Sequence, residues 1–179
     1  MNTKAQKIDD DQTSRVYVAC LASYNAGVLH GRWIDVDGMD EEDIGEEIEK
    51  VFKTSPAEGA EEYAIHDYDG PLGPLASWLG EHPDLETLCA IVDAFGDHEP
   101  GAVRAFIGWD GSWDRERFEE SYQGEWDSFE DFAEHLADET IEGLRDCESL
   151  LARYFDYDAF ARDLRYDYYE VDGHVFYCV

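Results

Sequence analysis

The stretch RVYVACLASYNAGVLHGRWIDV, residues 15–36, decides the fold of the first third of the chain. Its two ends, Arg15–Leu21 and Val28–Val36, are rich in the β-branched and aromatic residues that favour strands. The ASYNAG segment between them is typical of a turn, because Asn and Gly both tolerate turn conformations. The stretch therefore predicts two neighbouring strands joined by a short connection.

A helix and a third strand are expected to complete a small α+β unit. Across residues 40–53 apolar side chains recur at i, i+4, i+7 and i+8, which predicts a helix whose buried face is made of Ile44, Ile48, Val51 and Phe52. Residues 62–68, EYAIHDY, predict the third strand. The DGPLGP run at residues 69–74 then breaks regular structure and marks an expected domain boundary.

The remaining segments predict mostly helices. In the middle, the clearest helix spans Asp84–Phe95 and is expected to stop at Gly96, whereas residues 99–109, EPGAVRAFIGW, fit either a helix or a buried strand. In the last third, one long helix lies within Ser128–Leu144 and a shorter one spans Asp158–Leu164. The Asp172-Gly173 pair between two aromatic-rich runs predicts a β-hairpin.

These elements together predict an α+β protein built as an elongated chain of three small domains. We expect a loose polar tail over residues 1–13 and an N-terminal α+β domain with a small antiparallel sheet over residues 14–74. A helical middle domain is expected over residues 75–114 and a C-terminal α+β domain over residues 115–179.

Charge is the dominant feature of the composition. There are 44 acidic and 13 basic residues, a net charge of −31, whereas solubility of a small domain needs a magnitude of only about 2–8. Nucleic acid and anionic membranes are excluded as partners, since both are bound through Lys and Arg. The favoured partner is a basic protein surface or a cation. Two stretches, residues 54–103 and 118–144, contain no Lys or Arg at all.

Two interpretations of this acidity remain open. The carboxylates form a solvated, salt-adapted surface, or they imitate the phosphates of DNA. Duplex DNA carries one charge per about 1.7 Å, so 44 carboxylates would match about 75 Å of duplex. A compact globule of 179 residues is only about 40 Å across. If all of the carboxylates imitate phosphates, the molecule must therefore be elongated.

Catalytic and metal sites find little support in the motifs. Calcium-loop spacing fails from both Asp35 and Asp110, and no phosphate-binding loop, dinucleotide fingerprint or zinc spacing is present. A carbohydrate-active enzyme would use Asp156 and Asp158 beside Tyr154, Tyr157 and Trp126, but acids lie near aromatics throughout this chain. We expect no cofactor, no metal and no enzymatic activity.

A soluble cytoplasmic location is expected. No apolar run is long enough to span a membrane, and the first residues lack the apolar core of a signal peptide. The cysteines are scattered without a C-x-x-C pair, which is typical of free thiols in a reducing compartment: Cys20, Cys89, Cys147 and Cys178.

Three motifs resemble the ArdA antirestriction proteins. They are VYVACLASYNAGVLHGRWIDV (16–36), EEYAIHDYDG (61–70) and ARYFDYDAFARDL (152–164), in the order found in the family. The middle, residues 75–112, matches only in acidity and length, and the N-terminal tail is a further departure. These departures leave the charge positions of the middle domain, and the range of targets, open.

The resemblance implies a fold, a partner and an activity. Members of the family are cytoplasmic proteins spread by mobile elements, elongated, with three small domains, and they dimerise. The dimer looks like bent B-form DNA, occupies the DNA-binding groove of type I restriction-modification enzymes, and blocks restriction and often modification. The resemblance implies neither catalysis nor a metal. The segment matching residues 152–164 is the family's antirestriction motif and is associated with the dimer contact.

Two sets of residues follow from this hypothesis. The expected phosphate-mimicking carboxylates are Glu42, Asp43, Glu46, Glu47, Glu61, Glu62, Asp84, Glu86, Asp93, Asp97, Glu119, Glu120, Asp127, Glu130, Asp131, Glu134, Asp138, Glu139 and Glu142. The expected antirestriction motif and dimer contact are Tyr154, Phe155, Asp156, Tyr157, Phe160, Arg162, Asp163 and Leu164.

Overall fold

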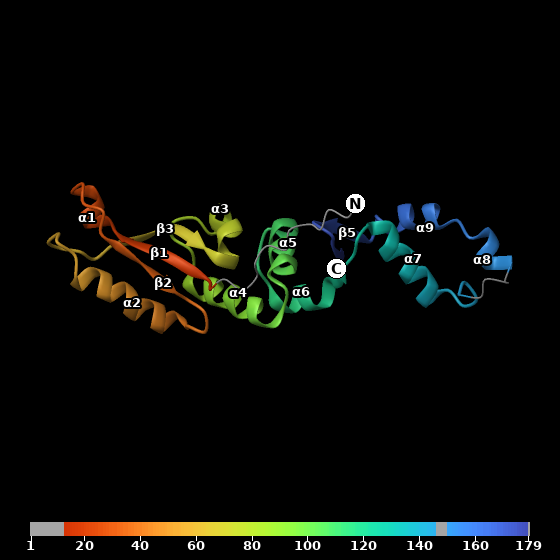
Figure 1. Cartoon of the computed structure of the whole chain (residues 1–179), viewed down its shortest axis with the longest axis horizontal. Coiled ribbons are helices and arrows are strands. Elements are labelled where there is room, and N and C mark those ends of the chain that lie inside the picture. The colour runs from red at the N-terminus through yellow and green to blue at the C-terminus, as the bar shows by residue number, and fades with distance from the viewer. Residues whose placement is uncertain (1–12, 146–149, 179) are drawn as a thin grey trace, which may run out of the picture. The chain divides into compact units, whose positions relative to one another are not determined.

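A computed structural model describes residues 13–145 and 150–178 (Figure 1). The chain divides into two compact units, Met1–Pro100 and Gly101–Val179, and each contains one three-stranded antiparallel sheet. The predicted mixture of helices and small antiparallel sheets is confirmed. The division into three domains along an elongated chain stays a prediction, and the predicted tail lies, apart from Thr13, outside the described residues.

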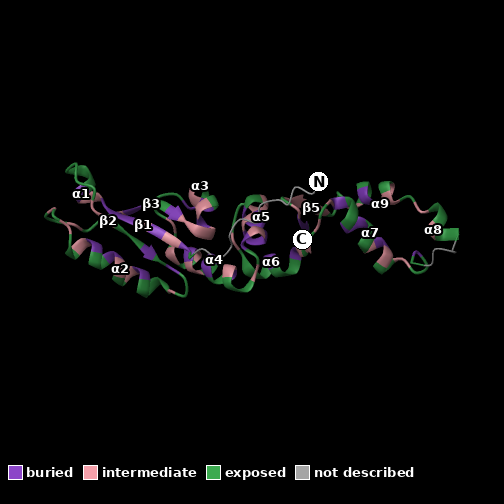
Figure 2. Ribbon diagram, in the orientation of Figure 1, coloured by how far each residue is buried: buried purple, intermediate pink, exposed green. Residues whose placement is uncertain are grey.

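The first unit is organised by the sheet that residues 15–36 begin. Its strands, in spatial order, are β2 (Gly31–Asp35), β1 (Arg15–Cys20) and β3 (Tyr63–Asp69). Helix α2 (Glu41–Lys53) packs against β1 and β2 and buries three residues of the predicted apolar face, Ile44, Ile48 and Val51. Figure 2 shows buried positions on α2 alternating with exposed ones. The three predicted strands and this helix are therefore confirmed.

Helix α2 begins at a reciprocal cap. The carboxylate of Asp40 accepts a hydrogen bond from the Asp43 backbone N–H, and the Asp43 carboxylate accepts one from the Asp40 N–H. This capping box satisfies two backbone donors that the first helical turn leaves without partners. Acids at this end are also favoured by the helix dipole.

The rest of the first unit differs from expectation in three places. The predicted turn ASYNAG contains a short helix, α1 (Leu21–Asn25). The predicted breaker DGPLGP forms a 3₁₀ helix, η1 (Gly70–Leu75), whose Leu72 and Leu75 are buried. It is followed by α3 (Ala76–Leu79). The stop predicted at Gly96 is two residues too early, since α4 spans Leu85–Asp97 with His98 as its C-cap, and Gly96 does not adopt the left-handed conformation that ends helices at glycine.

The second unit settles the ambiguous segment and contains two elements that the sequence did not predict. The segment EPGAVRAFIGW forms α5 (Pro100–Asp110). The unpredicted elements are α6 (Arg115–Ser121) and β4 (Tyr122–Glu125). Strand β4 belongs to the sheet of order β4-β6-β5, with β5 at Tyr168–Val171 and β6 at His174–Tyr177. Positive φ at Asp172 and Gly173, 51° and 84°, makes the tight turn of the predicted hairpin.

Three further helices complete the second unit: α7 (Phe129–Thr140), α8 (Leu150–Tyr154) and α9 (Tyr157–Leu164). Helix α7 begins at Ser128, whose hydroxyl accepts a hydrogen bond from the Asp131 N–H. Helices α7 and α9 pack together around a buried cluster of Phe129, Phe132, Ala133, Ala161 and Val175. The predicted helices at residues 128–144 and 158–164 are confirmed, the first in shorter form.

Two glycines in the first unit provide a test of how β1, β2 and α2 are arranged. A Cβ added at Gly31 would overlap the Val18 backbone carbonyl and reach 3.0 Å from the Tyr17 ring, whereas a Cβ at Gly45 on α2 meets nothing within 4 Å. We predict that Gly31→Ala lowers the free energy of unfolding by about 1–3 kcal/mol. Gly45→Ala should raise it by about 0.5–1 kcal/mol, because alanine is the better helix former. Urea unfolding measures both, and equal effects would contradict the register of β1 and β2.

Candidate functional site

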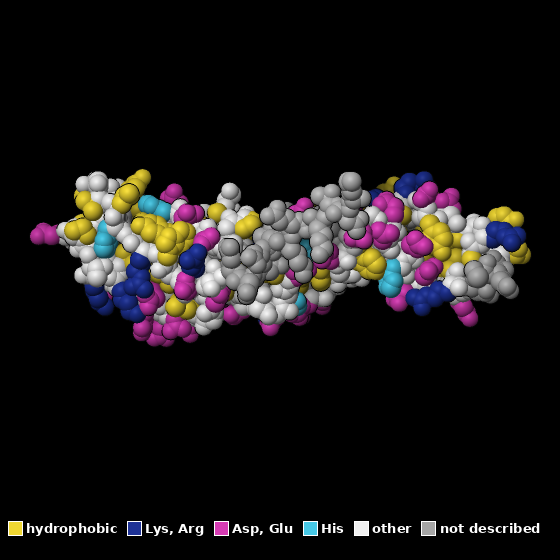
Figure 3. All heavy atoms as spheres, viewed as in Figure 1, with side chains coloured by type: hydrophobic (Ala, Val, Ile, Leu, Met, Phe, Trp, Pro, Cys, Tyr) yellow, Lys and Arg dark blue, Asp and Glu magenta, His cyan; other side chains and the backbone are white. Residues whose placement is uncertain are grey.

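The acidic residues of α2 are the first part of the candidate surface. Glu42, Asp43 and Glu46 are exposed, and Figure 3 shows acidic side chains gathered along this helix with basic ones beside them. Glu47 differs, because it is half-buried and forms ion pairs with both Arg32 and Lys50. The hydrogen bond from the Lys50 ammonium holds the pKa of Glu47 below its ordinary value, and the Arg32 charge adds to this. Glu47 is thus neutralised within the chain.

The other predicted carboxylates of the first unit lie in a base-free part of the chain. All are exposed: Glu61, Glu62, Asp84, Glu86, Asp93 and Asp97. One of these carboxylates, that of Asp84, also has a structural role. Asp84 caps α4, and hydrogen bonds from the hydroxyl and the backbone N–H of Thr87 lower the pKa of its carboxyl. Such a cap keeps the carboxylate ionised and fixed at the start of the helix.

Helix α7 carries the densest group of predicted carboxylates. Glu130, Glu134 and Asp138 recur every four residues, and Asp131 and Glu139 flank them. Glu130 accepts a hydrogen bond from Arg165 at 3.1 Å, and Asp138 accepts one from the Tyr157 hydroxyl at 3.0 Å. Within residues 13–145 and 150–178, Glu134 makes no ion pair or side-chain hydrogen bond.

Four predicted carboxylates lie around α6 and beyond α7. Glu119 is 3.3 Å from Arg115, and Glu120, Asp127 and Glu142 are exposed. Of the nineteen predicted carboxylates, only Glu47 and Asp138 are half-buried and the rest are exposed. That these carboxylates imitate phosphates stays a prediction, and the sequence did not separate those paired with the chain's own bases from those left open.

The predicted dimer residues differ in what they contact. Phe160 and Leu164 pack against the buried cluster of α7 and α9, and Asp156 caps α9 by accepting a hydrogen bond from the Ala159 N–H. These three support the fold of the chain itself. By contrast, Tyr154 at the end of α8 is 78% exposed.

Two exposed leucines, which were not among the predicted residues, lie on α8 together with Tyr154. Leu150 is 71% exposed, and Leu151 is also exposed, so α8 presents an apolar face to solvent together with Tyr154. The signal for them was present in the sequence, since Leu150 and Tyr154 stand at the i, i+4 spacing of one helical face. We call Leu150, Leu151 and Tyr154 the α8 patch.

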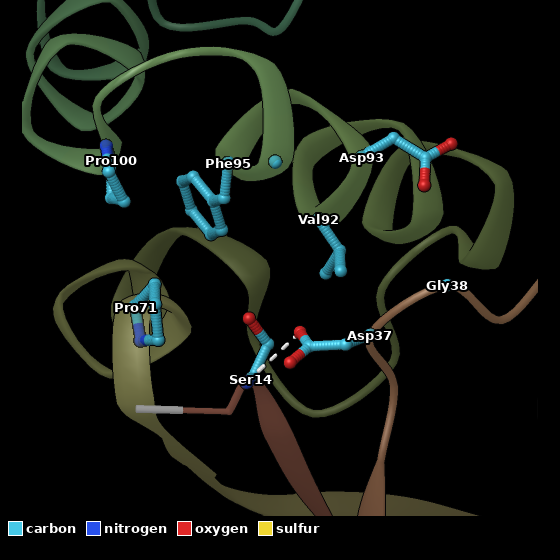
Figure 4. A pocket seen from close by; sticks show the side chains of 9 residues that line it. Ser14, Asp37, Gly38, Pro71, Val92, Asp93, Phe95 and Pro100 are labelled. Atoms are coloured by element: carbon cyan, nitrogen blue, oxygen red, sulfur yellow. Dashed lines mark hydrogen bonds between the residues drawn. The ribbon is translucent and has the colours of Figure 1, made fainter. Parts of the chain in front are cut away.

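A pocket of about 420 Å³ lies in the first unit between the start of β1 and α4 (Figure 4). Its apolar walls include Pro71, Val92 and Phe95, and the Ser14 N–H donates a hydrogen bond to the Asp37 carboxylate at 3.1 Å. The residues that line it include no histidine, lysine or cysteine that could act as a base or nucleophile. The hydrogen bond joins the residue before β1 to the loop that follows β2.

The described residues have three further properties, which concern metals, membranes and thiols. No group of three or more metal-ligating side chains converges in them. None of their helices combines the length and the apolar character needed to cross a membrane. Cys20, Cys89 and Cys178 are free thiols, and Cys147 lies outside the described residues.

The comparison with protein families identifies the chain. The family model described as antirestriction protein (ArdA) matches residues 16–177, which includes nearly all of both units. The chain belongs to the ArdA family of antirestriction proteins. Membership confirms the resemblance and implies an antirestriction function exerted on restriction enzymes. No curated protein matches the chain closely enough to add to this.

Family membership also bears on the competing hypothesis of a carbohydrate-active enzyme. ArdA proteins are antirestriction inhibitors and not a known family of enzymes. Asp156, which that hypothesis would use as an acid or base, accepts the Ala159 N–H as a helix cap. Trp126 packs against Phe132 and His135. The candidate site of this ArdA protein is accordingly its acidic surface.

The ion pair between Glu130 and Arg165 allows a test by titration. The pKa of Glu130 is lowered first by its own backbone N–H and second by Arg165. We predict that Arg165→Met raises this pKa part of the way to the ordinary value of about 4.3, as measured by carboxyl ¹³C chemical shifts. The stability that the pair contributes is present above the ordinary pKa and is lost as the pH falls through the lowered value. An unchanged pKa would show that the pair does not form in solution.

Proposed function

We propose that the chain is a DNA mimic that occupies the DNA-binding groove of type I restriction-modification enzymes and so blocks restriction and modification. The acidic residues of helix α7 are the main support for this proposal. Its 12 residues include five acids and no Lys or Arg. At about 1.5 Å per residue the helix is about 18 Å long, so its acids recur once per about 3.6 Å along the axis, including Glu130 and Glu139, which pair with arginines. A single strand of duplex DNA presents one phosphate per about 3.4 Å.

The fold holds these carboxylates in fixed positions. Phe129, Phe132 and Ala133 of α7 are buried, which anchors the helix, while four of its five acids are exposed: Glu130, Asp131, Glu134 and Glu139. Because the carboxylates are ordered before binding, less conformational entropy is lost when they meet a partner. Lys and Arg side chains of a DNA-binding groove can then form charge-assisted hydrogen bonds with carboxylates in place of phosphates.

Imitation of the DNA backbone also sets the range of targets. Phosphate contacts position a protein on DNA but carry no base sequence. A mimic that presents only charge and spacing can therefore occupy grooves that recognise different sequences. The alternative hypothesis of a salt-adapted surface predicts the opposite. The protein would need molar salt to fold and would have no effect on restriction.

The open carboxylate of Glu134 gives a direct test of this proposal. Neighbouring like charges at i, i+4 destabilise a helix by about 0.2–0.5 kcal/mol per pair, and Glu134 has such a neighbour on each side. We predict that Glu134→Gln raises the free energy of unfolding by about 0.5 kcal/mol. It should also weaken inhibition of a purified type I endonuclease about two- to fivefold, because one charged contact is lost.

Glu47→Gln is the matched control for this experiment. It removes the same single charge, but from a carboxylate already paired with Arg32 and Lys50. It should lower the stability and leave inhibition unchanged. Equal inhibition by the Glu134 variant and the wild type would contradict a role for the α7 row, and no inhibition by the wild type would contradict the proposal as a whole.

We further propose that the protein forms a homodimer through α8 and α9. The α8 patch supplies exposed apolar side chains next to the antirestriction motif, and burial of such a surface is a common source of subunit affinity. Phe160 is a poor choice for testing this contact, because it packs against its own subunit.

Substitutions on the α8 patch test the dimer. We predict that Leu150→Glu with Tyr154→Glu produces monomers, because four carboxylates would then face one another across a symmetric contact. Sedimentation measures the mass. Tyr166→Glu is the control, since Tyr166 is 85% exposed but lies after α9. A double variant that still sediments as a dimer would place the contact elsewhere.

A further inference from the structure

The sheet of the first unit has one face that α2 does not cover. Arg32 points towards α2, since it pairs with Glu47, so its neighbour Trp33 points to the opposite side. The strand register then places six side chains on this open face in two rows across the three strands: Trp33, Tyr17 and Asp67 in one row, and Asp35, Arg15 and Asp69 in the next. In Figure 3 a group of hydrophobic side chains lies over this sheet with charged ones beside it.

Two aromatic rings form the centre of this face. The rings of Tyr17 and Trp33 meet edge to face with their centroids 5.5 Å apart. Trp33 is nevertheless 40% exposed, so part of its indole is open to solvent. A tryptophan face is the best aromatic acceptor for a cation.

The charges on this face are unbalanced. Three carboxylates stand with one guanidinium, and that guanidinium, Arg15, is paired with Asp69. Asp67 accepts the backbone N–H of Tyr68, and Asp35 has no ion pair or side-chain hydrogen bond within the described residues. Asp35 is two residues from Trp33 on the same strand, hence on the same face beside the indole.

The chain's own arginine shows the kind of contact that the face supports. The guanidinium carbon of Arg15 lies 5.8 Å from the centroid of the Trp33 ring while the same side chain pairs with Asp69. One arginine thus combines a carboxylate and the indole. The unpaired carboxylate of Asp35 and the exposed part of Trp33 offer the same combination to a second guanidinium.

We propose that this face binds an arginine side chain of the enzyme's DNA-binding surface, with the guanidinium over Trp33 and against Asp35. The inference rests on the proposed function, and it adds a contact that phosphate imitation alone does not supply. Arginine is the expected occupant because phosphate-binding surfaces are built from Lys and Arg, and the planar guanidinium is the one that stacks on aromatic rings.

Binding to a purified type I restriction-modification enzyme, measured at several salt concentrations, tests this proposal. Trp33→Ala should weaken affinity about three- to thirtyfold at every salt concentration and leave the salt dependence unchanged, because it removes no charge. Asp35→Asn should weaken affinity and reduce the slope of log affinity against log salt by up to about one. Trp78→Ala is the matched control, since Trp78 is 39% exposed but lies on α3, outside the sheet, and it should bind as the wild type does.

The outcomes separate the inference from the function on which it rests. A wild type that does not bind overturns the proposed function, whereas a wild type that binds together with an unaffected Trp33→Ala overturns only the inference. If Trp33→Ala lowers the urea midpoint, the test moves to Trp33→Phe and Asp35→Asn. Their double variant should lose less affinity than the product of the two single losses, because one guanidinium contacts both side chains. Independent losses would contradict a shared arginine.

Discussion

The packing of α7 against α9 holds a row of like charges together. Phe129, Phe132 and Ala133 meet Ala161 and Val175 in a buried cluster. Of the acids beside it on α7, Glu134 is exposed, Glu130 bonds to Arg165, and Asp138 is half-buried against Tyr157. Without that apolar contact, mutual repulsion among the carboxylates would oppose helix formation. Helix α2 follows the same plan, with Ile44, Ile48 and Val51 buried beneath an acidic outer side. In both helices the hydrophobic face provides the stability that the charged face reduces.

The thirteen bases of the chain further divide the acids into two kinds. Glu47, Glu130 and Glu139 form ion pairs with Arg or Lys of the same chain. The pairs with arginine tie a helix to a strand or a neighbouring segment. Glu134 stands among them without such a pair in the described part of the chain. An antirestriction surface built on charge should depend mainly on the second kind, because a carboxylate already paired has less to offer a partner's arginine or lysine.

Much of this fold could be predicted from local sequence, because the deciding signals act over a few residues. Runs rich in β-branched and aromatic residues predicted β1 and β3, the i, i+4 pattern predicted α2 and α7, and Asp172-Gly173 predicted the last hairpin. Strand β4 was missed, because its sequence YQGE has no strand pattern and is held by pairing with β6, some fifty residues away. The neutralisation of Glu47 by Arg32 was missed for the same reason, as it depends on how α2 lies against β2. Likewise, only the packing of α9 shows that Phe160 lies against the buried cluster of its own chain.

The salt dependence of binding is the measurement that tests the central claim most directly. Affinity of the wild-type protein for a purified type I restriction-modification enzyme should fall steeply as salt rises, with a slope of log affinity against log salt close to that of duplex DNA in the same assay. The protein and the duplex should also compete for one site. Binding that is insensitive to salt, or that leaves the bound duplex in place, would contradict the account of carboxylates acting as phosphates.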